Sequence, residues 1–273
     1  MADEIGDRRR LMWIDVFRCF LYTSLGQFDR AVSISERAYA LAKAIGYAHP
    51  GPPELVAWAN VLAGQRVRAR ETIEEAVRLL AGFLSEGPTA YGVQALVLLD
   101  AGEIEAAKRV LTQASEALEQ FPRADHLMVG GAWLALGWMS VDEPARARAL
   151  ATGVLEQLPV GWLAEVAAFS HVVLGRIAAD EREFAEAEQE LQAATVALGD
   201  VPLLPARVEL ELGWHHLNRL QGKAAEAQGH LRNAEALIAQ ISAMLEDPRI
   251  RESFQTSYVA RRVQAAREAF ATA

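Results

Sequence analysis

Three histidines are candidate metal ligands, because imidazole is a common ligand of zinc. His215 and His216 are adjacent in the sequence, and His171 lies about 45 residues before them. Neighbouring residues on a helix point about 100° apart, so this pair cannot hold one ion comfortably. No cysteine or carboxylate cluster with metal-ligand spacing completes a set. We therefore expect structural histidines, no metal and no cofactor.

Nucleophilic and acid–base chemistry can be tested in the same way. Ser170 and His171 pair a hydroxyl with a base, but no glycine-flanked turn or oxyanion donor accompanies them. The carboxylate pairs Glu74–Glu75 and Asp180–Glu181 are typical of solvated helix faces rather than of acid and base partners. We find no catalytic constellation and predict that the chain is not an enzyme. An enzyme that uses the helices as a scaffold is the least supported of three hypotheses.

Composition narrows the class of partner. Hydrophobic residues make up 52% of the 273 residues and the net charge is −9, which disfavours broad binding of nucleic acid or anionic membranes. The run Asp7–Arg10 is short, begins with an acid and opens a helix. The single Cys19 fits a reducing compartment and a buried, inert thiol. With no membrane-spanning run and no signal peptide, we expect a soluble, cytoplasmic protein.

The elements that would position any site are set by a repeat of alanines, separated by 38, 38, 40, 40 and 40 residues. These anchor alanines are Ala31, Ala69, Ala107, Ala147, Ala187 and Ala227. Seven residues after each anchor comes another alanine, except that Val154 stands in the fourth repeat. A fixed period of this length predicts a repeat array in which small residues let neighbouring helices approach closely.

A turn signal precedes each anchor by five residues. It is glycine at 26, 64, 102 and 222, whereas Asp142 and Arg182 stand at this position in repeats four and five. Most of the prolines lie between helical segments, and no strand-like alternation is long enough to matter. Each unit therefore reads as helix, turn, helix, and the fold class is all-α.

The period predicts six helical hairpins over 8–246, followed by a capping helix. The hairpins are expected at 8–46, 53–84, 88–121, 125–158, 162–199 and 203–246. The last helix, over 249–272, places Phe254, Tyr258, Val263, Ala266 and Phe270 on roughly one face. An amphipathic helix at the end of such an array covers the last open face.

The first helix lacks the polar side that a terminal repeat in water should have. Trp13, Phe17 and Phe20, with Met12, Val16 and Leu21, make it apolar over most of its circumference. We infer that an upstream domain, a partner or a second copy of the chain covers it. The alternative is that this helix buries itself against the second and third helices.

The turn-and-anchor segments resemble the centre of tetratricopeptide (TPR) repeats. They include Leu25–Ala31, Asp100–Ala107 and Leu220–Ala227, together with Leu174–Gly175 and Leu212–Gly213. The resemblance implies a right-handed α-solenoid. The usual period is about 34 residues, so this chain has longer helices or connections.

Shorter phrases resemble one branch of that superfamily. Glu4–Asp7, Ala44–Tyr47 and Ala197–Asp200 resemble the ends of long second helices, and Asp247–Phe254 resembles a closing helix. They are similar to the carboxy-terminal TPR regions of bacterial signalling ATPases: LuxR-type and maltose-activator-type regulators, cyclases and kinases. The resemblance implies a regulatory module in signal transduction or transcription. Because the sequence has no nucleotide-binding loop, the ATPase would lie upstream, and the chain would be a fragment.

In TPR arrays the first helix of each pair lines the concave surface. Two rows, eleven and eight residues before the anchors, give the candidate binding residues Phe20, Trp58, Leu96, Leu136, Met139, Arg176, His216 and Arg219. They predict a groove that is apolar over four repeats and cationic over the last two. Such a groove suits a peptide segment, a neighbouring nucleotide-binding domain or a second copy of the chain. A metabolite with an apolar body and an anionic group is the alternative, and the large side chains could instead pack between first helices.

Overall fold

The structure is a computed structural model that describes residues 7–121, 131–158 and 163–271. Over these ranges it contains helices and no strand, which confirms the all-α prediction. The helices form TPR-like hairpins and the fold is an all-α solenoid, in two compact units. Unit 1 comprises residues 1–121 and 242–258, and unit 2 comprises residues 122–241 and 259–273.

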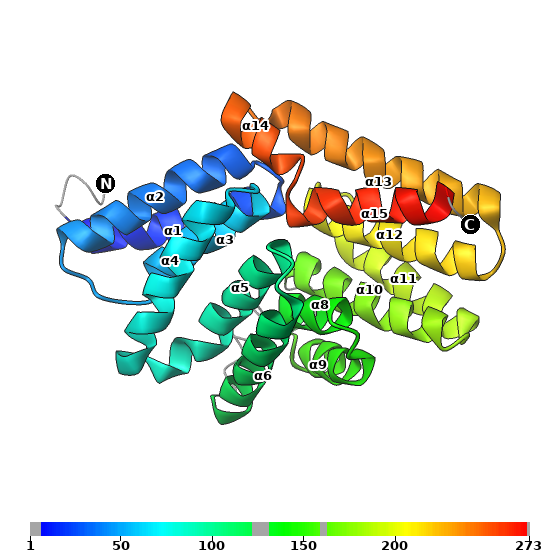
Figure 1. Cartoon of the computed structure of the whole chain (residues 1–273), viewed down its shortest axis with the longest axis horizontal. Helices are drawn as coiled ribbons and strands as arrows, with labels where there is room; N and C mark the ends of the chain where they lie inside the picture. The colour runs from blue at the N-terminus through cyan, green and yellow to red at the C-terminus, as the bar shows by residue number, and fades with distance from the viewer. Residues whose placement is uncertain (1–6, 122–130, 159–162, 272–273) are drawn as a thin grey trace. The chain divides into compact units, whose positions relative to one another are not determined.

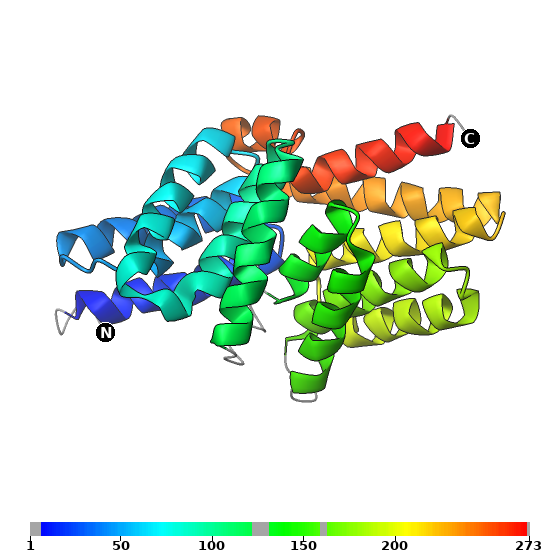
Figure 2. The ribbon, with the colours of Figure 1, turned by 60° about the horizontal axis from the view of Figure 1, so that its bottom comes forward.

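Unit 1 holds three hairpins, which Figures 1 and 2 show in blue to green. The first pairs α1 (Arg8–Ser24) with α2 (Phe28–Ala44), and the second pairs α3 (Gly51–Leu62) with α4 (Arg66–Leu79). Two 3-10 turns, η1 (Leu80–Gly82) and η2 (Leu84–Glu86), lead to the third pair, α5 (Gly87–Asp100) and α6 (Ile104–Gln120).

Unit 2 continues the same pattern. Its pairs are α8 (Ala132–Ser140) with α9 (Pro144–Gln157), α10 (Ala164–Asp180) with α11 (Phe184–Leu198), and α12 (Leu204–Leu220) with α13 (Ala224–Met244). Residues 125–130 of the predicted hairpin at 125–158, and residue 162 at the start of the hairpin at 162–199, lie outside the described residues.

The anchor alanines form the core of the hairpins. All six have an exposed fraction of 0%, and so do the alanines seven residues later; Val154 is 1% exposed. A larger side chain at these crossing points would push neighbouring helices apart, because protein interiors have no spare volume. The periodic spacing of small residues is therefore confirmed as a packing requirement.

The turns before the anchors share a left-handed backbone. Gly64 and Gly102 have φ of +78° and +77°, and Asp142 and Arg182 adopt +59° and +67° at the equivalent positions. A left-handed conformation costs a side-chain-bearing residue about 1–2 kcal/mol. The hairpin geometry thus imposes this conformation even where the sequence does not supply glycine.

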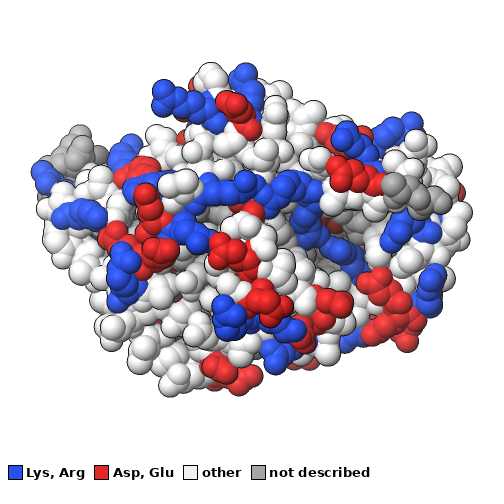
Figure 3. Space-filling view, in the orientation of Figure 1, with Lys and Arg blue, Asp and Glu red and all other residues white. Residues whose placement is uncertain are grey.

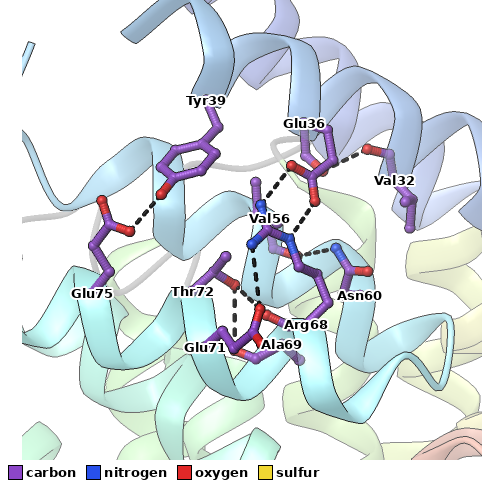
Figure 4. A network of polar contacts seen from close by, with 11 residues as sticks. Val32, Glu36, Tyr39, Val56, Asn60, Arg68, Ala69, Glu71, Thr72 and Glu75 are labelled. Atoms are coloured by element: carbon purple, nitrogen blue, oxygen red, sulfur yellow. Dashed lines mark hydrogen bonds and ion pairs between the residues drawn. The ribbon is translucent and has the colours of Figure 1, made fainter. Parts of the chain in front are cut away.

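Ion pairs join the second helices of the first two hairpins (Figure 4). The guanidinium of Arg68 on α4 donates to both carboxylate oxygens of Glu36 on α2, at 2.7 and 2.8 Å. Tyr39 on α2 donates to Glu75 on α4, and Glu71 lies 3.5 Å from Arg68. Bidentate contacts of this kind fix the register of one hairpin on the next.

The segment predicted as one capping helix over 249–272 forms two helices, α14 (Pro248–Phe254) and α15 (Tyr258–Ala271). In unit 1, α14 packs on the first two hairpins: the rings of Phe254 and Phe28 lie 5.4 Å apart, and Ser253 donates to the carbonyl of Ala63 at 2.7 Å. In unit 2, α15 packs along α12, where Arg262 lies 2.8 Å from the Glu209 carboxylate.

Candidate functional site

Three of the apolar candidates for the concave groove are interior residues. Trp58, Leu96 and Leu136 are only 8%, 5% and 1% exposed. The indole of Trp58 donates to the hydroxyl of Thr23 on the neighbouring first helix, at 3.4 Å. The interpretation of these three side chains as an accessible groove wall is therefore wrong. Trp58 packs against a neighbouring first helix, as the alternative prediction stated, and Leu96 and Leu136 are buried as well.

Phe20 and Met139 are half-buried, and they belong to different units. Phe20 packs against the core of the first hairpin, around Met12 and Cys19.

The polar candidates gather on two neighbouring first helices of unit 2. Arg176 lies on α10, and His216 and Arg219 lie on α12. The Nε2 atom of His216 is 2.6 Å from a carboxylate oxygen of Asp180 at the end of α10. Arg219 is exposed, whereas Arg176 and His216 are half-buried. These four residues are the candidate site.

Electrostatics keep the imidazole of this site neutral. Burial lowers the pKa of His216, and the positive charge of Arg176 lowers it further; Asp180 opposes this shift and Arg219 adds a smaller decrease. A neutral ring then donates its Nε2 proton to Asp180, and the positive charge of the site resides on the two arginines. This arrangement offers charged donors to a carboxylate or phosphate group.

The adjacent His215 is structural, as predicted. Its Nδ1 lies 2.9 Å from the carbonyl of Ala227, the anchor of its own hairpin, and the side chain is 4% exposed. Cys19 occupies the equivalent position in the first hairpin, with Sγ 3.6 Å from the Ala31 carbonyl. Burial raises the pKa of Cys19 to about 12, so the thiol is inert at neutral pH, which confirms that expectation.

The remaining histidines of unit 2 link the two helices of a hairpin. His171 on α10 contacts Glu190 on α11 at 2.7 Å. Forty residues later the partners are exchanged: Glu211 on α12 contacts His230 on α13 at 2.8 Å. Ser170, the other member of the tested nucleophile pair, is 0% exposed. This geometry supports packing rather than nucleophilic chemistry.

No group of three histidine, cysteine or acidic residues suited to a metal ion is found among the described residues. Within the same ranges, no helix is both long enough and apolar enough to cross a membrane. Figure 3 shows acidic and basic side chains interspersed over the visible face, with grey where residues are not described.

Two features of the structure were not predicted from the sequence. Asp180, interpreted as part of a solvated face, is the partner of His216. Glu54 near the start of α3 is half-buried, and the pKa of its carboxyl is raised to about 8, chiefly by burial and also by the charge of Glu86. Its only sequence signal was an acid in an otherwise apolar helix, Gly51–Leu62.

Comparisons with known proteins bear on the fold. No family model matches the chain, and no curated protein matches it in sequence. Among solved structures, it is similar to the crystal structure of a Rap protein complexed with competence and sporulation factor, with a TM-score of 0.58 and 16% identity. The similarity covers 96% of this chain and 76% of that one. At this identity the likeness supports the TPR-like helical repeat fold, and the fold alone.

Proposed function

We propose that the chain is a non-catalytic interaction and regulatory module, which binds a peptide segment or a neighbouring domain through an anionic group held by Arg176 and Arg219, beside His216. The observation that carries the proposal is the cationic cluster on α10 and α12, within unit 2. The TPR-like hairpins agree with it, because such arrays present first-helix side chains to extended ligands.

The setting we propose is the sensor arm of a larger bacterial signalling or transcription-regulating protein. Its support is the resemblance of Ala44–Tyr47, Ala197–Asp200 and Asp247–Phe254 to the TPR regions of signalling ATPases. The Rap protein of the similar structure is complexed with competence and sporulation factor, so the fold can serve a complex of this general kind.

A small anionic metabolite is the second candidate ligand. The observation that favours it is the burial of Trp58, Leu96 and Leu136, so these residues do not form the extended apolar groove that was predicted. The charged site on α10 and α12 is therefore a local one. A compact ligand needs few polar groups and a limited contact area.

Peptide selection from a random library displayed against the full chain tests the first candidate. A selected peptide should lose at least tenfold in affinity in the Arg219→Glu variant. Arg232→Glu makes the same charge change at an exposed position of the second helix α13 and should have no effect.

Thermal unfolding with a panel of anionic metabolites tests the second candidate. A metabolite present at one hundred times its dissociation constant adds about 2.7 kcal/mol of stability. Stabilisation that disappears in Arg219→Glu, without competition by any peptide, would favour the metabolite. If neither ligand class responds to Arg219→Glu, the proposed site is wrong.

A further inference from the structure

The outer face of α1 exposes a stripe of large apolar side chains. Ile14, Phe17 and Leu21 are 48%, 70% and 55% exposed, and their spacing of three and four residues places them on one side of the helix. The opposite side of α1, which includes Met12, Val16 and Cys19, is buried in the first hairpin. Self-burial of the first helix, the alternative considered from the sequence, therefore covers only one of its two sides.

The residues equivalent to the stripe are buried in every other hairpin for which the preceding hairpin lies in the same unit. Counted from the anchors, the stripe corresponds to Pro52, Leu55 and Ala59 on α3, and to Ala90, Val93 and Val97 on α5. On α10 and α12 it corresponds to Ser170, Val173 and Ile177, and to Leu210, Gly213 and Leu217. All of these residues are buried, and each helix packs on the first helix before it: α3 on α1, α5 on α3, α10 on α8 and α12 on α10.

The other end of the described chain is built differently. The outer face of α15 carries exposed Gln264, Arg267 and Glu268, while Tyr258 and Val263 are buried. A terminal helix of this protein can therefore have a polar outer face. The outer face of α1 is apolar instead, as is typical of a helix face that another helix covers.

The charges around the stripe indicate which kind of partner it fits. Arg10 and Arg18 flank it with side chains 71% and 47% exposed, and Arg8 and Arg9 are exposed at the start of the helix. Two acids lie near the stripe: Asp15, only 3% exposed, pairs with Arg37 and lies 3.8 Å from Arg18, and Asp7 pairs with Arg10, so four arginines on the helix face two acids. The rim of the stripe is thus basic, on a chain whose net charge is −9.

We infer that the α1 stripe docks an amphipathic helix with acidic flanks, which lies along α1 where a preceding first helix would lie. Two copies packed stripe to stripe would bring their basic rims together, which is unfavourable. An acidic flank complements Arg10 and Arg18 while its apolar face covers Phe17. This surface is on unit 1 and is independent of the cationic site on α10 and α12.

Three synthetic peptides and the full chain test the inference. All three peptides are helical; two carry apolar residues at positions i, i+3 and i+7, flanked by glutamate or by lysine, and the third is a scrambled glutamate peptide. Fluorescence anisotropy should show the glutamate-flanked peptide binding at least tenfold more tightly than the other two. Phe17→Glu should abolish that binding, and the charge reversal Arg18→Glu should shift preference toward the lysine-flanked peptide.

Val196→Glu is the matched control, since Val196 on α11 is 71% exposed and does not lie on the stripe. It should bind the glutamate-flanked peptide like the parent chain. Equal binding of the glutamate and lysine peptides, or no binding of either, would overturn the inference. So would a dimer, detected by light scattering, that Phe17→Glu dissociates, because the occupant would then be a second copy.

Discussion

Replacing Gly64 by alanine should release α14 from the first two hairpins of unit 1. A Cβ atom at Gly64 would lie 2.2 Å from the carbonyl oxygen of Ser253, a distance that real Cβ contacts do not reach. Because the obstacle is backbone, a rotamer change cannot relieve it. The segment carrying Ser253 and Phe254 has to move away from the turn between α3 and α4.

Gly102 provides the control for backbone strain. Its φ of +77° is almost that of Gly64, at +78°, and a Cβ atom there would meet nothing within 4 Å. Gly102→Ala should therefore cost only the left-handed penalty of about 1–2 kcal/mol. Gly64→Ala carries the same penalty and, in addition, the loss of α14 docking.

The additional cost follows from what α14 buries. Phe254 is 0% exposed, and burial of such a side chain is worth about 1.5–3 kcal/mol. The Ser253 hydroxyl donates to Ala63 and accepts from Gln65, both at 2.7 Å, and each such bond contributes about 1 kcal/mol. We expect Gly64→Ala to cost about 3.5–5 kcal/mol more than Gly102→Ala.

Hydrogen exchange resolved by segment is the suitable assay, because repeat arrays can depart from two-state unfolding. Amides of α14 should exchange at least tenfold faster in Gly64→Ala than in the parent chain and should be unchanged in Gly102→Ala. In a Phe254→Ala background, the extra cost of Gly64→Ala over Gly102→Ala should shrink by about 1.5–3 kcal/mol, the part assigned to Phe254. Equal costs of the two glycine substitutions in the parent chain, with unaltered exchange in α14, would refute the reasoning.

Four further predictions concern charged groups. A double-mutant cycle of Arg68→Ala and Glu36→Ala, measured by urea unfolding, should give a coupling of about 0.5–1 kcal/mol that falls in 1 M salt, since both side chains are over one-third exposed; no coupling would contradict the role given to this pair. The pKa of Glu54 is about 8, above its unfolded value, so stability should decline as pH rises from about 4.5 through 8, and Glu54→Gln should remove this decline in pH-dependent unfolding curves. The pKa of His216 is lowered, so its effect on stability has the opposite pH dependence. The stabilising contribution of the neutral imidazole should be lost as pH falls below about 6.5, and His216→Gln should abolish that loss. Because protonation of His216 adds positive charge, an anionic ligand should bind more tightly at pH 5.5 than at pH 8 in a titration, and this gain should persist in Arg219→Ala and vanish in His216→Gln.

The packing of the hairpins could be predicted from the sequence because it depends on residue size at fixed intervals. The spacing of Ala31, Ala69 and their successors marks every crossing point, and all of these alanines are fully buried. Asp142 and Arg182 could be placed in the turn by register alone, although their left-handed φ runs against residue preference. Tertiary packing here overrides a local penalty of about 1–2 kcal/mol.

The accessibility of the concave rows could not be predicted in the same way. Register places Trp58 and Arg176 at equivalent positions, but exposure depends on the side chains of the neighbouring first helices. Trp58 is buried, with its indole against Thr23 of the preceding first helix. Arg176, whose neighbouring first helix contributes His216 and Arg219, stays half-buried because polar and charged groups retain solvent. The repeat therefore determines where a residue lies in the array, whereas the side chains of two neighbouring first helices determine whether that residue is accessible to a ligand.

The break between α14 and α15 shows a further limit of local patterns. Residues 254–258 contain neither glycine nor proline, so nothing in them predicts a helix end. The stop comes instead from contacts distant in the sequence: Gln65 donates to Ser253 across 188 residues, and Arg66 donates to the carbonyl of Thr256. In an ideal solenoid each repeat contacts only its neighbours. Residues 242–258 break that rule within unit 1, and closing so long a loop from the unfolded state would cost about 5 kcal/mol, so we expect this segment to dock after the intervening chain has folded.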